Sequence, residues 1–379
     1  MAGVLAAAAV AVPDGERLRL HRPGWLALEG GRVVDAGGGV APGALDLGDV
    51  VLGPGFVDVQ INGVHDVDFA IADEDGWRRA GRSLLGHGVT SYCPTLVSAP
   101  LGRYGPTLER IAAARDDAAT RGLPAIAGVH LEGPFLGGAP GAHAPELLRL
   151  AQPEWLSARL DAQPGLVRIV TLAPEADPML AATRLLAQRG VIVAIGHSSA
   201  PYEDVIDAVD AGARVVTHLF NGMPQFHHRE PGLVGAALDD DRLTPTIIGD
   251  LVHVHPVGLR LAVARKRNVA LVTDAVAVPG RSADLTWSEV EGAARLADGT
   301  LAGSVSTMDV SVRNLVSIGV RLDRALELAA AVPARLLDLD QYAVGIGGCA
   351  DLVALDATTL AVRAVWIEGV QLRGPEVWR

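Results

Sequence analysis

Lysine is almost absent from this sequence, where Lys266 is the single example. Lysine and arginine together number 32 against 44 acidic residues, so the formal net charge is −12, and no run rich in basic residues occurs. Nucleic acids and anionic membrane surfaces are bound through clustered positive charge. The charge balance therefore predicts no nucleic-acid partner and no membrane partner.

Cysteine is also scarce, and Cys93 and Cys349 lie far apart with no CxxC spacing. Two such cysteines do not make a disulfide framework and fit a protein of the reducing cytoplasm. The apolar opening MAGVLAAAAVAV lacks a basic segment and runs into the turn Pro13–Glu16. We interpret it as a first β-strand, with a signal peptide as the alternative. No uncharged apolar stretch is long enough to predict a membrane span.

The chain has 379 residues, 49% of them hydrophobic, which is enough for a full barrel core and a smaller appendage. From Met1 to Asp49 it reads as short strands with turns rich in glycine and proline, including a hairpin at Glu29–Arg32. Asp351–Val370 has the same texture. These segments predict one small β domain built from both chain ends, at 1–51 and 342–379, with a barrel at 52–341 between them.

Strand-like runs alternate with helical runs from Val50 to about Leu339, which predicts a parallel α/β barrel. The clearest unit has an apolar run at Val191–Ile195, a helix that begins after Pro201, and a second run at Arg214–Thr217. Both runs are short, β-branched and unalternating, as expected of strands buried on two sides. Further expected elements are strands at Phe56–Ile61, Val89–Thr95, Ala125–His130, Thr246–Ile248 and Val269–Thr273, and helices at Trp77–His87 and 108–121.

Two histidines follow the runs of this unit, His197 after the first and His218 after the second. They are therefore expected at the C-terminal ends of neighbouring parallel strands, where α/β barrels place their chemistry. One such histidine alone is better explained as a satisfied loop or core residue. The matched pair favours metal ligation.

A third strand end carries Glu132, in HLEGPF. By itself this carboxylate is better explained as a solvated turn residue, but glutamate with two histidines is a catalytic zinc-type set that leaves one position open for water. His143 lies in the loop that follows and is expected over the mouth of the site. Asp274, after a late strand, is a candidate general base, with a fourth ligand or a turn residue as alternatives.

Candidate substrate contacts follow these strands. Asn221 and Gly222 offer backbone N–H groups near a strand end, and Arg229 belongs to a local basic cluster with two histidines. The cluster is either a solvated or oligomer-forming loop, or a site for a phosphate or carboxylate, which arginine binds with two parallel hydrogen bonds. His253 follows the next strand, and Ser304 precedes a helix.

Seven motifs in this order resemble the N-acetylglucosamine-6-phosphate deacetylases of the amidohydrolase superfamily. They span about Pro54 to Leu336, and they read PGFVDVQING, HLEGPF, GHSSAPY, THLFNGM, HREPG, LVTDA and DGTLAGS. The resemblance implies a distorted (β/α)8 TIM-type barrel with a small β-sandwich domain. It also implies hydrolysis of the acetamide of N-acetylglucosamine 6-phosphate to glucosamine 6-phosphate and acetate, in amino-sugar catabolism and cell-wall sugar recycling.

The same resemblance implies a role for each candidate residue. Glu132, His197 and His218 would hold one divalent ion, zinc first, with iron, cobalt and manganese as alternatives. Asp274 would be the general base and acid, while His143 and His253 would contact the sugar or polarise the carbonyl. The remaining substrate contacts would be Asn221, Gly222, Arg229 and Ser304. Arg229 would come from the same subunit or from a neighbouring one, since a homodimer is typical of the family.

Two departures from the superfamily bear on the number of metal ions. Many amidohydrolases carry His-x-His on the first strand, where this chain has Gln60 and Asn62, on one face of the strand. Many also use a carboxylated lysine, whereas Lys266 lies in a helical stretch and not at a strand end. Both features predict one metal ion rather than two. Leu251 and Gly222 stand where the family has glycine and alanine, which leaves substrate detail open.

Two alternatives remain open at this point. An amidohydrolase of the same mechanism could act on N-acetylgalactosamine 6-phosphate or on another N-acyl amino compound. A barrel without catalytic activity, serving assembly or binding, is the alternative from another class, and the complete set of roles argues against it.

Overall fold

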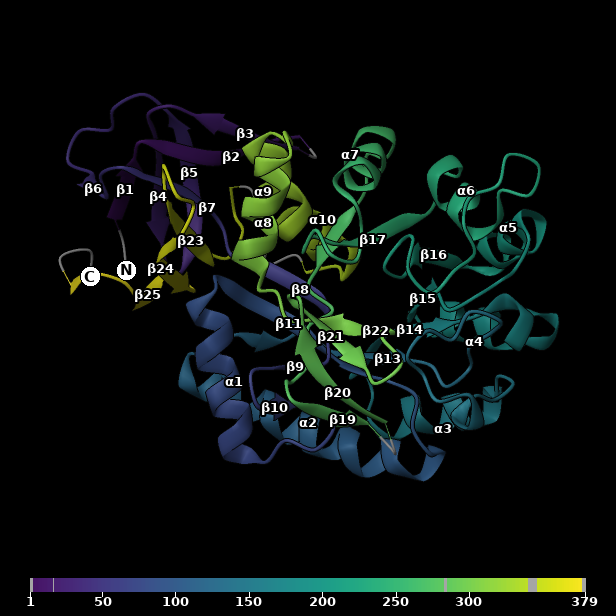
Figure 1. Ribbon diagram of the computed structural model, residues 1–379. Coiled ribbons are helices and arrows are strands. Elements are labelled where there is room, and N and C mark those ends of the chain that lie inside the picture. Colours follow the sequence, from purple (N-terminus) through teal and green to yellow (C-terminus); the bar gives the residue numbers. More distant parts are fainter. Residues whose placement is uncertain (1–2, 16, 283–284, 340–345, 377–379) are drawn as a thin grey trace.

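A parallel barrel forms the centre of the computed structural model, which describes residues 3–15, 17–282, 285–339 and 346–376 (Figure 1). Neighbouring strands follow the chain order from β8 through β11 and β13 to β18. Backbone bonds near Asp274 and Gln60 close the barrel, with 2.9 Å from the Asp274 nitrogen to the Gln60 oxygen. The strands are β8 (Phe56–Ile61), β11 (Val89–Leu96), β13 (Val129–Glu132), β14 (Val167–Leu172), β15 (Ile192–Ile195), β16 (Ala213–Val216), β17 (Thr244–Ile248) and β18 (Ala270–Val272). The predicted barrel is confirmed.

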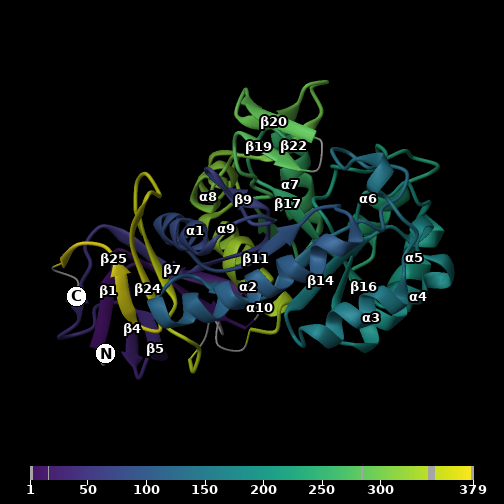
Figure 2. The ribbon, with the colours of Figure 1, turned by 90° about the horizontal axis from the view of Figure 1, so that it is seen from below.

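Helices surround the barrel (Figures 1 and 2). They are α1 (Glu74–Gly86), α2 (Leu101–Arg121), α3 (Pro153–Ala162), α4 (Ala181–Gln188), α5 (Tyr202–Ala211), α6 (Gly232–Asp239), α7 (Pro256–Arg265), α8 (Met308–Ser317), α9 (Leu322–Leu326) and α10 (Val332–Leu336), with short 3-10 turns at Pro145–Leu147, Pro174–Ala176 and Pro178–Leu180 and a π-helical turn at Glu327–Ala331. No helix in the described part of the chain is long and apolar enough to cross a membrane.

The strands are buried on both sides, as their unalternating sequences predicted. One apolar layer fills the barrel interior with small and branched side chains from successive strands, in the manner typical of this fold. It contains Val57, Val59, Cys93, Ile169, Ala194, Val215, Ile248 and Val272. The unit from β15 through α5 to β16 matches its prediction, and α5 ends at Gly212, whose φ of 126° few other residues adopt.

Both ends of the chain build a lobe beside the barrel, shown in purple and yellow in Figure 1. One sheet has the order β5-β4-β1-β6 and the other the order β25-β24-β23-β7-β2-β3. The strands are β1 (Gly3–Ala7), β2 (Ala9–Asp14), β3 (Arg17–His21), β4 (Gly24–Glu29), β5 (Arg32–Gly38), β6 (Leu45–Asp46), β7 (Val50–Pro54), β23 (Leu352–Asp356), β24 (Val362–Ile367) and β25 (Val370–Arg373). Apolar side chains from both sheets, among them Leu26 and Trp366, form one cluster between them, which makes the lobe a β-sandwich.

The domain limits predicted from the sequence stay predictions. Strand β7 crosses the limit at 51/52, because it pairs with β2 and β23 of the lobe and leads directly into β8. The limit at 341/342 lies outside the described residues.

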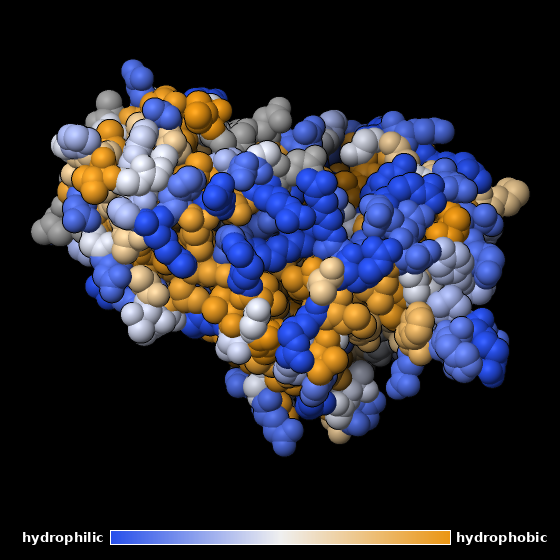
Figure 3. Space-filling model, turned by 90° about the horizontal axis from the view of Figure 1, so that it is seen from above, coloured by the Kyte–Doolittle hydropathy of each residue, from blue (hydrophilic) through white to orange (hydrophobic). Residues whose placement is uncertain are grey.

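A four-stranded antiparallel sheet between β18 and α8 was not predicted. It contains β19 (Gly280–Ser282), β20 (Leu285–Val290), β21 (Ala293–Leu296) and β22 (Leu301–Ser304). Figure 2 shows this sheet projecting from the barrel, and Figure 3 shows hydrophobic residues gathered around its base. Smaller strands near the barrel are β9 (Gly63–Val64), β10 (Val67–Asp68) and β12 (Ala125–Ile126).

Candidate metal centre and active site

Three side chains from three strand ends converge on one point, and we call Glu132, His197 and His218 the donor triad. His197 Nε2 lies 2.9 Å from Glu132 Oε1, and His218 Nε2 lies 3.0 Å from the same oxygen. The two imidazole Nε2 atoms are 3.0 Å apart. All three residues are buried. Ligands of tetrahedral zinc at about 2.0–2.1 Å stand roughly 3.3 Å from one another, so the donor triad already has nearly that spacing.

The proton positions in the donor triad also fit a cation. His197 Nδ1 faces the Ala139 carbonyl at 3.3 Å, and because a carbonyl only accepts, Nδ1 carries the proton and Nε2 has a free lone pair. That lone pair points at another imidazole nitrogen and at a carboxylate oxygen. Burial would raise the pKa of Glu132, but the two imidazoles beside it outweigh burial and hold this pKa well below its usual value. A buried anion with two imidazoles is a favourable site for a divalent ion.

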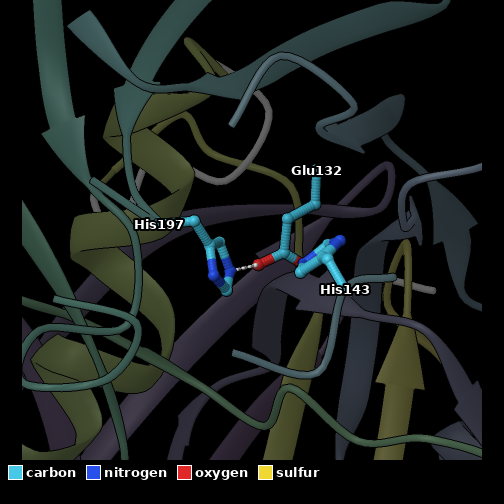
Figure 4. A group of neighbouring side chains, drawn as sticks. All are labelled: Glu132, His143 and His197. Atoms are coloured by element: carbon cyan, nitrogen blue, oxygen red, sulfur yellow. Dashed lines mark hydrogen bonds and ion pairs between the residues drawn. The ribbon is translucent and has the colours of Figure 1, made fainter. Parts of the chain in front are cut away.

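His143 is the fourth group beside these atoms. Glu132, His143 and His197 also offer ligand atoms within 4.8 Å of one another, and Figure 4 shows the three side chains pointing toward a common centre. However, His143 Nδ1 accepts from the Ser98 N–H at 3.4 Å, so its proton lies on Nε2 and that nitrogen is a donor. We therefore favour His218 over His143 as the third ligand. Burial lowers the pKa of His143 to about 3, so its ring is neutral.

Asp274 lies beside the donor triad and is held by two amides. Gln60 Nε2 donates to Asp274 Oδ1 and to Glu132 Oε1, both at 3.2 Å, and Asn62 Nδ2 donates to Asp274 Oδ1 at 2.9 Å. Burial and, to a smaller extent, the negative charge of Glu132 raise the pKa of Asp274 to about 7. A carboxyl group with such a pKa can both take up and release a proton near neutral pH.

The backbone at these strand ends is strained. His197, His218 and Asp274 are each the second residue past a strand, and their φ values of 50°, 31° and 48° lie in the left-handed region. Leu251, past β17, has φ of 64°. Residues without glycine's freedom adopt this conformation at a cost and cluster at functional sites. The left-handed conformation therefore recurs at all three of these candidate site residues.

A cavity of about 340 Å³ opens over the donor triad. Asp274, His143 and His253 line it together with Asn221 and Gly222. The unpredicted sheet supplies a wall from Trp287, Leu296, Thr300 and Leu301, and β10 supplies Asp68. Among the described residues that line the cavity there is no lysine or arginine.

A family model for the amidohydrolase family matches residues 51–374. The chain belongs to the amidohydrolase family. It is also similar to the N-acetylglucosamine-6-phosphate deacetylase of Bos taurus, with 39% identity over 97% of each chain. The N-acetylgalactosamine-6-phosphate deacetylase of Escherichia coli O157:H7 is 37% identical over 84% of this chain and 87% of that one.

A solved amidohydrolase structure shares this fold over nearly its whole length. It is an N-acetyl-D-glucosamine-6-phosphate deacetylase mutant from Mycobacterium smegmatis in complex with N-acetyl-D-glucosamine-6-phosphate. The TM-score is 0.88 at 36% identity, and the similarity covers 98% of this chain and 99% of that one. The predicted resemblance and fold class are confirmed.

The remaining predicted residues of this amidohydrolase lie in different surroundings. His253 Nδ1 lies 2.6 Å from Asp250 Oδ2, which fixes the ring at the cavity wall. The Asn221 N–H donates to the His218 carbonyl at 2.9 Å, while the Gly222 N–H bonds no other described residue. A side-chain carbon at Gly222 would lie 2.7 Å from His197 Nδ1, so glycine allows the close approach.

Two predicted substrate contacts do not line the cavity of this single chain. Arg229 is exposed, and its Nη1 lies 2.9 Å from His228 Nε2. Ser304 is buried, and its hydroxyl donates to the Thr273 carbonyl at 2.5 Å, whereas its neighbour Gly303 reaches the cavity. Lys266 is buried elsewhere and donates to the Asp240 carbonyl at 2.6 Å, so it is not available as a bridging ligand.

Sequence reasoning missed three groups near the site. Gln60 stands where many amidohydrolases have a histidine ligand, and its side-chain amide donates to both Glu132 and Asp274. Asp68 lies in a short strand that no periodicity reveals. The wall around Trp287 could have been found from its turns, since Glu291-Gly292 and Asp298-Gly299 flank the strand β21 and both glycines have positive φ.

Proposed function

We propose that this amidohydrolase removes the acetyl group of N-acetylglucosamine 6-phosphate, giving glucosamine 6-phosphate and acetate. The observation that carries the proposal is the donor triad with Asp274 beside it at the C-terminal end of the barrel. Relatives that share most of the chain carry the names of such deacetylases. We place the reaction in cytoplasmic amino-sugar catabolism and cell-wall sugar recycling, which suits the two free cysteines.

The donor triad would hold one divalent ion, with zinc first for a set of one carboxylate oxygen and two imidazole nitrogens. When bound, such an ion polarises a carbonyl and acidifies water, which amide hydrolysis needs. Gln60 keeps the Glu132 and Asp274 carboxylates at fixed positions through one amide group.

Asp274 would move the proton. Its Oδ1 is occupied by the Asn62 and Gln60 amides, so the second oxygen is left to accept a proton from the attacking water. Asp274 then delivers that proton to the amide nitrogen, because an amine leaves poorly without it. A native pKa of about 7 suits both steps.

His143 and His253 would bind the acetamide and the sugar. The neutral His143 ring presents an Nε2–H into the cavity, and such a donor stabilises charge that develops on the carbonyl oxygen. His253 is oriented by Asp250. Burial would raise the pKa of Asp250, but the bond to His253 outweighs burial and lowers this pKa.

No lysine or arginine among the described lining residues is available to pair with the phosphate. The Gly222 N–H offers one hydrogen bond, and Arg229 offers two parallel ones. Because Arg229 is exposed and outside the cavity, we propose that it reaches the site of a second copy of the chain in a homodimer.

N-acetylgalactosamine 6-phosphate is the second candidate substrate, since a relative with that name is 37% identical to the chain. The two sugars differ in the orientation of one hydroxyl group. Acetate release from both, measured with the same enzyme at low substrate concentration, gives the ratio of kcat/KM values and identifies the preferred sugar.

The central test compares metal-depleted and zinc-reconstituted protein in an acetate-release assay with N-acetylglucosamine 6-phosphate. We expect turnover only after reconstitution, with zinc content near one ion per chain. Full activity of protein shown to be free of metal would contradict the proposal. Absence of acetate release from both phosphorylated sugars by zinc-loaded protein would contradict the proposed substrate and would leave another N-acyl amino compound or a non-catalytic barrel as the alternatives.

A further inference from the structure

We propose that Glu175 is a positioning residue for His197: its carboxylate fixes the loop that orients this imidazole. The inference rests on the proposed role of His197 as a metal ligand. Glu175 was not among the residues expected from the sequence, and it does not line the cavity.

Glu175 joins two separate segments of the chain. Its Oε1 accepts from the Gly138 N–H at 3.1 Å and from the Ser199 N–H at 2.7 Å. The Ser199 hydroxyl is a further donor to Oε1, at 3.4 Å, and the Ser198 hydroxyl donates to Oε2 at 2.6 Å. One carboxylate therefore ties the loop after β13 to the turn that directly follows His197.

The loop held in this way controls the orientation of His197. Its Gly137 N–H donates to the His197 carbonyl at 2.8 Å, and its Ala139 carbonyl accepts the His197 Nδ1–H at 3.3 Å. The second bond keeps the proton on Nδ1 and the lone pair of Nε2 toward Glu132. Partners of this kind fix the tautomer and the ring orientation of metal-binding histidines. Because 3.3 Å is already long, a small outward shift of the loop breaks the bond.

The contact between Glu175 and the loop needs small residues. A side-chain carbon at Gly137 would lie 2.0 Å from Glu175 Oε1, and one at Gly138 would lie 2.2 Å from Ser199 Oγ. Neither glycine has a φ in the left-handed region, so backbone freedom does not explain them. The close approach of the loop backbone to the Glu175 carboxylate explains why both residues are glycine.

The role of Glu175 is geometric rather than a matter of ion pairing. Within the described residues it forms no ion pair, and the groups that donate to it are backbone N–H and serine hydroxyl groups. The residue is exposed, so its removal creates no cavity in the core. Its loss should therefore affect the metal site much more than the stability of the fold.

The test measures zinc affinity by competition with a chromophoric chelator for wild type, Glu175→Ala, Glu175→Gln and His197→Ala. Loss of a partner that orients a metal-binding histidine costs 10–100-fold in affinity, and we expect about 10-fold for Glu175→Ala because it acts through the loop. Glu175→Gln keeps an oxygen for the two N–H donors and should recover most of the affinity. His197→Ala should lose zinc binding.

Asp356→Ala is the matched control. In β23, Asp356 Oδ1 accepts hydrogen bonds from the Thr358 N–H, the Thr359 N–H and the Thr359 hydroxyl. The substitution therefore removes a similar set of bonds in the lobe, and zinc affinity should not change. Unfolding temperatures of all metal-free variants show whether the fold is intact.

The outcomes separate this inference from the proposed function. If wild type binds zinc and His197→Ala does not, but Glu175→Ala binds as tightly as wild type, the inference about Glu175 is wrong. An equal loss of affinity in Glu175→Ala and Asp356→Ala would also overturn it. If wild type itself fails to bind zinc or another divalent ion, the metal-dependent function is wrong.

Discussion

Asp58 gives the chain a pH-dependent stability that one substitution should remove. This carboxyl group lies in β8, fully buried among apolar side chains of the barrel. It accepts from the Thr273 hydroxyl at 2.6 Å and, more weakly, from the N–H groups of Thr273 and Gln60, both at 3.3 Å. Burial raises its pKa from 3.8 to about 7, and the bonds from Thr273 oppose that rise only in part.

The direction of the effect follows from the two pKa values. The native carboxyl of Asp58 holds its proton up to about pH 7, whereas in the unfolded chain it loses the proton near pH 3.8. Stability from this group is therefore fully present below pH 3.8 and is lost as the pH rises to about 7. A shift of this size is worth about 4 kcal/mol in total, of which about 2.5 kcal/mol falls between pH 5 and 8.

Asp58→Asn imitates the protonated carboxyl, because its amide can donate to the Thr273 hydroxyl and its oxygen can accept the two N–H groups. Relative to wild type, the variant should gain about 2.5 kcal/mol in unfolding free energy between pH 5 and 8. Urea unfolding of both proteins across this range, at saturating zinc, measures the difference and cancels the pH dependence of the metal site.

Asp323→Asn is the control for this experiment. The bonds from Arg321 hold the pKa of Asp323 below its usual value, and neither the carboxylate nor the guanidinium titrates between pH 5 and 8. Its variant should differ from wild type by a constant amount. A constant difference for Asp58→Asn as well would mean that Asp58 is charged throughout this range, and the reasoning about its burial would be refuted.

Three further substitutions test the site. Asp274→Asn should retain zinc and lose 10²–10⁴-fold in kcat, the usual contribution of a general acid-base group, and loss of zinc in a metal assay would make Asp274 a ligand instead. Arg229→Ala should raise KM for the phosphorylated sugar by about 10–100-fold while its effect on the unphosphorylated sugar stays small, and equal effects on both would remove the phosphate role. Leu251→Gly should be more stable than Leu251→Ala by about 1 kcal/mol in thermal unfolding, because the left-handed backbone at this position favours glycine. The reverse order of stability would show that the backbone there is not strained.

The barrel and the centre of its site could be predicted because their signals are local. Strands such as β15 and β16 are apolar runs rich in β-branched residues, and α/β barrels place their functional residues at the C-terminal ends of such strands. Glu132, His197 and His218 could therefore be placed together without any knowledge of their distances. The hairpins of the lobe were also visible, since Glu29 and Arg32 pair as expected across their turn.

Interactions between distant segments could not be predicted in the same way. Asp58 looks like an interruption of an apolar strand until Thr273, 215 residues later, is seen to bond it. Glu175 is an ordinary residue after a strand until the loop with Gly138 is placed on it. Arg229 is exposed and does not line the cavity, so its proposed role at the phosphate depends on a second copy of the chain, which no pattern within one sequence reveals. The sheet with Trp287 was missed because its strands are short, although the turns at Glu291-Gly292 and Asp298-Gly299 mark their ends.

The sheet β19–β22 lies apart from the groups proposed to cleave the substrate. Its strands pair with one another, and backbone bonds between Ser304 and the segment Asp274–Val276 connect it to the end of β18. Its described residues supply side chains to the outer wall of the cavity but no member of the donor triad. Substitutions in this sheet can therefore change the shape of the cavity while the donor triad and Asp274 keep their geometry. New specificity within this scaffold would evolve most readily there.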